Sequence, residues 1–276
     1  MNKRGFIYVV SGESFVAEAG RSAARVRELH GLPITLISDR EPAPEHRAAF
    51  DEVRIELSGF DYADKLLMRA SPYEQTLFLD SDTLVTRPLD DIFTLLDQFD
   101  VAFQFTEGGN HYALPGVPVC FLEPSAGIIA WRRGPGADKF FDSWASSYAE
   151  IEREQGKKGA WDQRSLRHAA FFSGARIAPL PIEWQVYTYR PNFLCQETRM
   201  LHGRDISDAL AASIDRRAGP RVWLPRVGLV PSLEKPSLRE FVAFTFRLGS
   251  RLLKRRLRLA LHHARIWRLP ENTRPA

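Results

Sequence analysis

Residues 76–85 read TLFLDSDTLV, an apolar strand-like run that ends on two carboxylates separated by one serine. Two like charges at this spacing repel each other, and a bound cation is the simplest reason for both to stay ionised. Asp80 and Asp82 are therefore a candidate metal site. The alternative is a solvated turn in which Asp80 and Thr83 form local hydrogen bonds.

The sequence on either side alternates between strand-like and helix-like segments. Apolar or alternating runs at 5–10, 34–38 and 53–57 predict strands, whereas 14–30 and 61–70 have helical patterns. This order predicts an α/β fold with a mainly parallel sheet and helices on its faces. In such sheets ligands bind at the carboxyl ends of the strands, where the predicted strands place Ser11, Gly12, Asp39, Asp80 and Asp82.

Composition and length are those of a soluble globular protein. The chain has 276 residues, of which 44% are hydrophobic and 26% charged. The apolar run at 6–10 is too short for a signal peptide, and no run has the length of a membrane span, so we expect a cytoplasmic protein. Cys120 and Cys195 have no metal-type or redox-type spacing, which favours free thiols in a reducing compartment.

Charge is distributed unevenly along the chain. Residues 1–236 contain 28 Lys and Arg against 32 Asp and Glu, a net charge of −4, whereas residues 237–276 contain 10 against 2, a net charge of +8. The second segment mixes Phe, Leu, Ile and Trp with its cations and predicts a basic amphipathic helix. Such a helix can lie on an anionic membrane surface. Alternatively, it packs on the domain or on a partner; we expect no nucleic acid.

The paired aspartates suit a hard divalent cation. Mg²⁺ and Mn²⁺ prefer oxygen ligands, commonly one or two carboxylates completed by water and substrate phosphates. Residues i and i+2 of an extended strand end face the same side. One carboxylate can then hold the metal while the other holds a ribose hydroxyl or a water molecule.

The segment YADKLLMRASPYEQTLFLDSDTLVTRPLDDIF (62–93) resembles the core of the GT-A glycosyltransferases, especially family-8-like nucleotide-sugar transferases. The similarity extends more weakly over residues 5–205. It implies a GT-A, Rossmann-like domain at 1–206, with a donor half at 1–105 and an acceptor half at 106–206. An irregular linker at 207–236 and the basic helical tail at 237–276 would follow.

The resemblance also implies a reaction and its ligands. The reaction would be metal-dependent hexosyl transfer from a nucleotide-sugar donor, usually a UDP-sugar, with Mn²⁺ or Mg²⁺ as cofactor. The acceptor would be a glycan or a lipid-linked acceptor. Family-8-like enzymes retain the configuration of the transferred sugar; in an inverting reaction, Asp162 would be the candidate base.

Site residues carry over from the resemblance by position. Lys65 would contact the donor phosphates or sugar, His202 would join Asp80 and Asp82 as a metal ligand, and Asp162 and Gln163 would face the reacting carbon. A small-residue turn at 124–127 would contact the donor sugar, although the family's Asn is absent from it. The longer His-x-x-Gly-x-x-Lys pattern is also absent. Further donor contacts are expected at Val10, Ser11, Gly12, Asp39, Ser81, Ser125, Gly127 and Gly203.

Each of these residues also has a structural interpretation. Lys65 could be a surface lysine, Asp162 a helix cap, Asp39 a turn residue and His202 a structural histidine. The loop at 106–123 is rich in Gly and Pro and is expected in the acceptor cleft. Three aromatic residues could stack on a sugar or belong to the core: Trp184, Tyr187 and Tyr189.

Two other functions fit the paired aspartates. A haloacid-dehalogenase-like phosphatase also ends a strand on Asp-x-Asp and uses the first Asp as nucleophile. Here Leu84 occupies the position of that family's Thr, and the motif lies far from the chain start. A non-catalytic sugar-nucleotide-binding protein is the second alternative.

Overall fold

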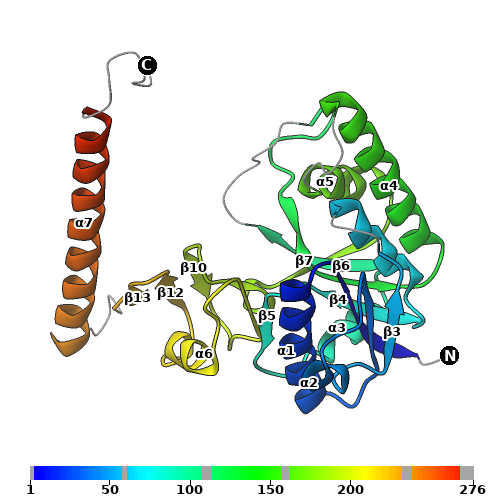
Figure 1. Ribbon diagram of the computed structural model, residues 1–276, viewed down its shortest axis with the longest axis horizontal. Coiled ribbons are helices and arrows are strands. Elements are labelled where there is room, and N and C mark those ends of the chain that lie inside the picture. The colour runs from blue at the N-terminus through cyan, green and yellow to red at the C-terminus, as the bar shows by residue number, and fades with distance from the viewer. Residues whose placement is uncertain (1–2, 58–60, 107–113, 157–161, 232–237, 268–276) are drawn as a thin grey trace.

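The computed structural model describes residues 3–57, 61–106, 114–156, 162–231 and 238–267. A seven-stranded sheet with the strand order β3-β2-β1-β4-β7-β6-β8 forms its centre (Figure 1). The strands are β1 (Arg4–Val10), β2 (Ile34–Ser38), β3 (Glu52–Ile55), β4 (Gln75–Leu79), β6 (Val101–Thr106), β7 (Glu123–Arg132) and β8 (Ile177–Leu180). The expected α/β architecture is confirmed, because β3, β2, β1 and β4 are parallel neighbours.

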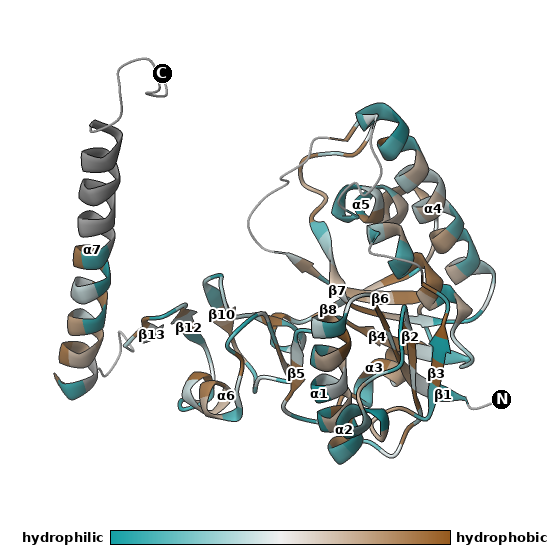
Figure 2. Ribbon diagram, in the orientation of Figure 1, coloured by the Kyte–Doolittle hydropathy of each residue, from teal (hydrophilic) through white to brown (hydrophobic). Residues whose placement is uncertain are grey.

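The central strands are apolar on both faces because each face is covered by helices. Phe6 and Tyr8 of β1 belong to a core cluster with the helix α1 (Glu13–Leu29), whereas Ile7 and Val9 point to the opposite cluster. That second cluster contains residues of α4 (Pro135–Gln155) and α5 (Gln163–Phe172). In Figure 2 the strands between these helices are mostly hydrophobic.

The strand β7 joins the two halves of the sheet. It pairs antiparallel with both β4 and β6, and β6 pairs parallel with β8. The register between β6 and β7 shifts between Phe103 and Phe105. As a result, the amino-terminal part of β7 leaves β4 and continues beside the end of β6.

Shorter elements complete the body. The expected helix at 61–70 is a 3-10 helix, η1 (Tyr62–Ala70), which begins with a capping box between Asp61 and Asp64. The small helices α2 (Pro44–Arg47), α3 (Asp91–Leu95) and η2 (Ile182–Trp184) lie between strands. A three-stranded sheet has the order β5 (Thr83–Val85), β11 (Met200–His202), β9 (Val186–Tyr187).

An irregular linker was expected at 207–236, and its described part, residues 207–231, is more regular than the sequence indicates. It contains α6 (Asp208–Ile214), β12 (Arg221–Leu224) and β13 (Gly228–Leu229), and β12 also pairs with β10 (Asn192–Leu194). Ile214 and Trp223 share a buried cluster with Val186 and Leu201. This packing crosses the expected boundary at residue 206 and corrects the linker prediction.

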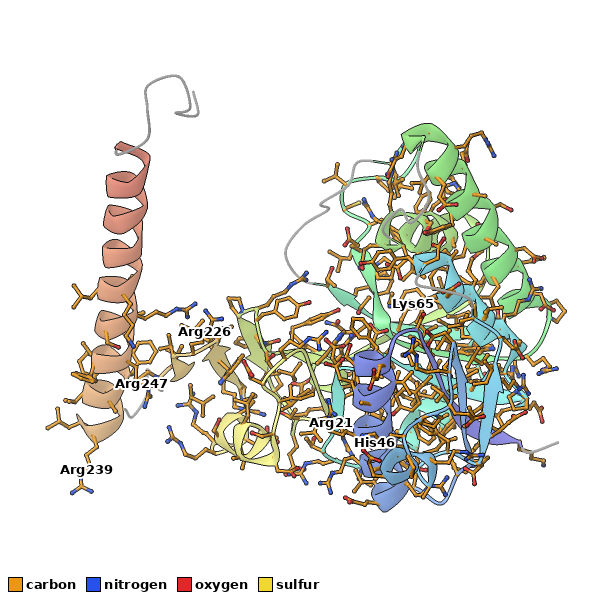
Figure 3. The ribbon with its side chains drawn as sticks, viewed as in Figure 1. Arg21, His46, Lys65, Arg226, Arg239 and Arg247 are labelled. Atoms are coloured by element: carbon orange, nitrogen blue, oxygen red, sulfur yellow. The ribbon has the colours of Figure 1, made fainter. Side chains whose placement is uncertain are left out.

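A long terminal helix, α7 (Leu238–Trp267), stands apart from the central sheet beside β12 and β13 (Figure 1). The Arg251 guanidinium donates to the carbonyl of Pro225, and Arg247 lines a small cleft with Leu229 and Val230. Figure 3 shows Arg239 near the start of the helix, pointing away from the body. Within the described residues, no helix combines the length and the apolar character that crossing a membrane requires.

Candidate active site

Asp80 lies directly after β4, where backbone contacts hold the strand end in place. Its N–H donates to the carbonyl of Gly127 in β7 at 3.1 Å. The Thr83 hydroxyl donates to the Asp80 carbonyl at 2.8 Å, so the local hydrogen bond of the turn interpretation is present. That bond uses the backbone oxygen and leaves the Asp80 carboxylate to face the cavity.

His202 comes from a distant part of the chain and lies beside both aspartates. The antiparallel pairing of β5 with β11 sets His202 opposite Thr83. Its Nε2 lies 3.1 Å from Asp82 Oδ1 and 3.8 Å from Asp80 Oδ2. One ligand atom from each of the three residues lies within 4.8 Å of the others, which suits one divalent cation.

The surroundings of the His202 ring fit a metal ligand. Its Nδ1 lies 2.6 Å from Gln185 Nε2, and Gln185 Oε1 is buried without a hydrogen-bond partner among the described residues. A half-turn of the amide would let Oε1 accept a hydrogen bond from the Nδ1–H of His202, leaving the Nε2 lone pair for a cation. A Cβ on Gly127 would overlap both side chains, so only glycine leaves room for this arrangement.

Electrostatics keep Asp82 ionised. Burial alone would raise the pKa of its carboxyl, but the hydrogen bond and the charge of His202 hold that pKa below its usual value. Asp82 is therefore available as an anionic ligand at neutral pH.

Lys65 is not a free surface lysine. Its Nζ lies 2.9 Å from Asp80 Oδ1 and 3.6 Å from Asp162 Oδ2, and its side chain is only 19% exposed. Burial lowers the pKa of Lys65, but the two carboxylates outweigh that effect and hold the pKa above its usual value. The ammonium is fixed in its charged form between Asp80 after β4 and Asp162 before α5.

Asp162 occupies the residue before α5 and is 2% exposed. It makes no side-chain capping bond, and its Oδ2 accepts no hydrogen bond from the described residues. Burial raises the pKa of its carboxyl, and Lys65 only partly offsets this. The side chain of Gln163 does not join the Lys65–Asp162 pair. Its amide donates to the carbonyl of Pro124 and ties α5 to β7.

A cavity of about 310 Å³ lies over these groups at the carboxyl ends of β1 and β4. Figure 3 shows Lys65 between the sheet and the helices that cover it. Six expected residues line the cavity: Val10, Ser11, Lys65, Asp80, Ser81 and Asp82. Seven others that the sequence did not single out complete the lining: Val9, Phe15, Leu57, Asp61, Tyr62, Asp64 and Arg204.

Three other residues expected to contact the donor, Gly12, Asp39 and Gly203, form hydrogen bonds within the protein. The N–H of Gly12 donates to Asp39 Oδ1 at 2.9 Å, and Arg40 holds the pKa of Asp39 below its usual value. Gly203 is at the end of β11, where its N–H donates to the Asp82 carbonyl at 2.9 Å. The roles of these residues in donor binding stay predictions.

The small-residue turn expected at 124–127 is wrong in its conformation. These residues lie inside β7, where Ser125 and Gly127 are buried in extended backbone. The Ser125 hydroxyl is 2.5 Å from the Tyr187 hydroxyl. β7 extends through 124–127 because it pairs with β6 beyond the register shift. The Pro and Gly in this segment had indicated a turn instead. Their contact with a donor sugar stays a prediction.

The three aromatic residues divide between core and surface. Trp184 and Tyr187 are buried, as their core interpretation predicted, whereas Tyr189 is 58% exposed beside Gly203. The expected acceptor loop is described only from residue 114, since 107–113 lie outside the described residues. Its described part is held by Arg167, which donates to the carbonyls of Phe121 and Pro118.

Comparisons with known proteins agree with this architecture. A structure of LgtC carrying an active-site substitution has a TM-score of 0.51 with 10% identity, covering 75% of this chain and 89% of that one. The chain has the GT-A fold. No family model matches it, and no curated protein does.

Other glycosyltransferases match this GT-A chain less closely. WbbM, a bifunctional enzyme, gives a TM-score of 0.47 with 14% identity over 76% of this chain. GlyE of Streptococcus pneumoniae TIGR4 gives 0.44 with 14% identity over 66%. The match covers 47% of the WbbM chain and 46% of the GlyE chain, so this chain corresponds to about half of each.

Sequence reasoning missed two parts of the site. Gln185 reaches His202 only because β9 and β11 pair, and no local pattern announces that pairing. Arg204 follows His202 and Gly203 directly, so the sequence HGRD carried a signal in its cation.

Proposed function

We propose that this protein is a metal-dependent glycosyltransferase that moves a hexose from a nucleotide-sugar donor to a glycan or lipid-linked acceptor. A UDP-sugar is the proposed donor. The observation that carries the proposal is the meeting of Asp80, Asp82 and His202 beside the buried Lys65–Asp162 pair. This group lies at the carboxyl ends of the strands of a GT-A fold, where α/β sheets bind their ligands.

Each residue has a chemical task in the proposal. Asp80, Asp82 and His202 would hold Mn²⁺ or Mg²⁺, which as a Lewis acid would stabilise negative charge on the departing diphosphate. Lys65 adds a fixed positive charge beside Asp80. Asp162, whose pKa burial raises, and Gln163 would face the reacting carbon. The strands β1 and β2 would bind the nucleoside through Val10, Ser11, Gly12 and Asp39.

The proposed reaction forms one bond and breaks another. The acceptor hydroxyl oxygen bonds to the anomeric carbon, the bond from this carbon to the diphosphate breaks, and its electron pair leaves with the nucleoside diphosphate. An oxygen of that leaving group takes up the hydroxyl proton. We propose retention of configuration. NMR of the first product from an α-linked donor tests this, because a β linkage would refute it.

A thermal-shift screen tests the function itself. Nucleoside diphosphates and nucleotide sugars are added with and without Mn²⁺, and we expect stabilisation that depends on the metal and differs between donors. Asp82→Asn should abolish the metal dependence because it removes an anionic ligand. Glu197→Gln, an exposed acid paired with Arg87 elsewhere, is the matched control. Metal-linked stabilisation that persists in Asp82→Asn would falsify the proposal, and donor binding without transfer would favour a non-catalytic binding protein.

We propose further that α7 holds the protein on an anionic membrane surface. Six large apolar side chains of the helix are exposed at helical spacing: Leu238, Phe241, Val242, Phe246, Leu252 and Leu253. The same helix contains eight of the ten Lys and Arg residues of the basic segment 237–276. An exposed apolar stripe flanked by cations supports interfacial binding.

Liposome flotation tests the membrane proposal. The full chain should float with vesicles that contain phosphatidylserine. With purely zwitterionic vesicles, it should stay at the bottom of the gradient. Replacing Phe241, Val242 and Phe246 together by serine should abolish flotation, whereas replacing the exposed Phe193 of β10 should leave it intact. Equal flotation of the triple variant and the unchanged protein would refute the proposal.

A further inference from the structure

The donor cavity has a cation whose present partner is not a ligand of the proposed metal. The acidic side chains that line the cavity are Asp61, Asp64, Asp80 and Asp82, and its cationic ones are Lys65 and Arg204. Lys65 is already held between two carboxylates. A strongly anionic diphosphate therefore needs positive charge beyond the metal and Lys65, and among the described lining residues Arg204 supplies it.

Arg204 is fixed at its backbone and exposed at its side chain. It follows His202 and Gly203, and the N–H of Gly203 donates to the Asp82 carbonyl. This anchors its Cα beside the candidate metal ligands. Its side chain is 60% exposed, and the guanidinium lies 5.7 Å from the centre of the Phe15 ring. Rotation of the side chain can therefore move the charge without moving β11.

Glu18 of α1 now holds this guanidinium. The two side chains form an ion pair, and the Glu18 carboxylate, only 16% exposed, also accepts a hydrogen bond from Ser81 Oγ at 3.3 Å. Ser81 stands between the two aspartates. Glu18 thus occupies, as an anion, the edge of the place where donor phosphates would lie.

A second cavity of about 300 Å³ lies on the far side of this ion pair. Arg204, Ser81 and Asp82 line both cavities, whereas Glu18 and Arg21 line the second one. Arg21 projects from α1 on the side of β5 and forms no ion pair with any described residue (Figure 3). It lies one helical turn from Glu18 and can neutralise that carboxylate when Arg204 leaves.

We propose that Arg204 binds the donor diphosphate and that Glu18 is its resting partner, which the phosphates displace. This rests on the proposed function and assigns its diphosphate contact to a residue outside the sequence pattern. Arg204 pairs with Glu18 in the empty protein and turns to phosphate oxygens, which its planar fork of N–H groups fits. Glu18 then pairs with Arg21 at the second cavity.

Calorimetric titration of the full chain with UDP and GDP in the presence of Mn²⁺ tests the exchange. Arg204→Met should weaken binding of the diphosphate about tenfold or more, while binding of uridine or guanosine stays unchanged. Arg204→Lys should recover part of the loss. Glu18→Gln should tighten diphosphate binding about threefold, because it removes the competing charge but keeps the shape.

Two controls separate this exchange from a purely structural ion pair. Arg87→Met and Glu197→Gln break an exposed pair far from the cavity and should leave both affinities unchanged. If the Glu18–Arg204 pair only fastens β11 to α1, both of its variants lose stability and neither gains affinity. Equal diphosphate affinity in Arg204→Met, or weaker binding in Glu18→Gln, overturns the proposal. If the unchanged protein binds neither diphosphate with Mn²⁺, the proposed function fails as well.

Discussion

Lys65→Met is expected to destabilise the fold, because it leaves the buried Asp162 carboxylate without its cation. The ammonium and this carboxylate are 19% and 2% exposed, so water screens neither well. Removing one partner of a buried pair costs about 3–5 kcal/mol. For a domain of this size, the midpoint of thermal unfolding should fall by roughly 2–4 °C for each kcal/mol.

The loss should also depend on pH with a definite sign. Burial already raises the pKa of Asp162, and Lys65 is what lowers it again, so the variant's folded-state pKa rises further. A carboxyl with a raised folded-state pKa destabilises the folded protein only when it is ionised. The destabilisation should therefore be small near pH 4, about the ordinary pKa of Asp, and grow as the pH rises toward neutrality.

Urea unfolding followed by tryptophan fluorescence at several pH values measures both effects. The double variant Lys65→Met/Asp162→Asn removes the uncompensated charge and should regain most of the loss, to within about 1–2 kcal/mol of the unchanged protein. Arg87→Met, which breaks an exposed pair, should cost at most about 1 kcal/mol. A single variant as stable as the unchanged protein, or a double variant less stable than the single, would refute the buried-pair argument.

Three more substitutions probe the site. In Gly127→Ala the new Cβ overlaps Gln185 and His202, which should lower the free energy of urea unfolding by about 1–3 kcal/mol and also weaken Mn²⁺ binding. Gly31→Ala, whose Cβ meets open space, should change neither. Gln185→Leu should weaken Mn²⁺ binding about 10- to 100-fold in a spin-resonance titration, and Gln185→Glu should preserve it, since a carboxylate still orients His202; equal loss in both would contradict this. Arg167→Met leaves the carbonyls of 118 and 121 unpaired and should cost about 1–3 kcal/mol, with faster hydrogen exchange at 114–122; unchanged exchange would show that the arginine does not hold this loop.

Local pattern was enough to predict the strands β1, β2, β3 and β4 of the sheet. The apolar runs of β1, β2 and β4 are continuous because helices cover both faces, and this made their parallel arrangement legible. The helix α1 begins and ends within one residue of its expected bounds at 14–30. The family resemblance, rather than local pattern, predicted Lys65 at the site of the two aspartates, and its Nζ lies 2.9 Å from Asp80 Oδ1.

The remaining parts depend on contacts that sequence spacing does not encode. β9 and β13 have only two residues each, which is too few to show a strand-like alternation in the sequence. The segment 124–127 reads as a turn, yet its backbone is extended because β6 continues beside it after the register shift. Gln185 and Glu18 became site residues only through pairing across β11 and the approach of α1.

The pairing of β5 with β11 sets a condition on when the candidate metal cluster can exist. Asp80 and Asp82 are synthesised long before His202. A growing chain that has completed only its first strands therefore contains two of the three candidate ligands. The full set appears once β11 has docked. Uptake of the ion would then report that the early and late portions of the polypeptide have met, and a fragment lacking either portion would be unable to mimic it.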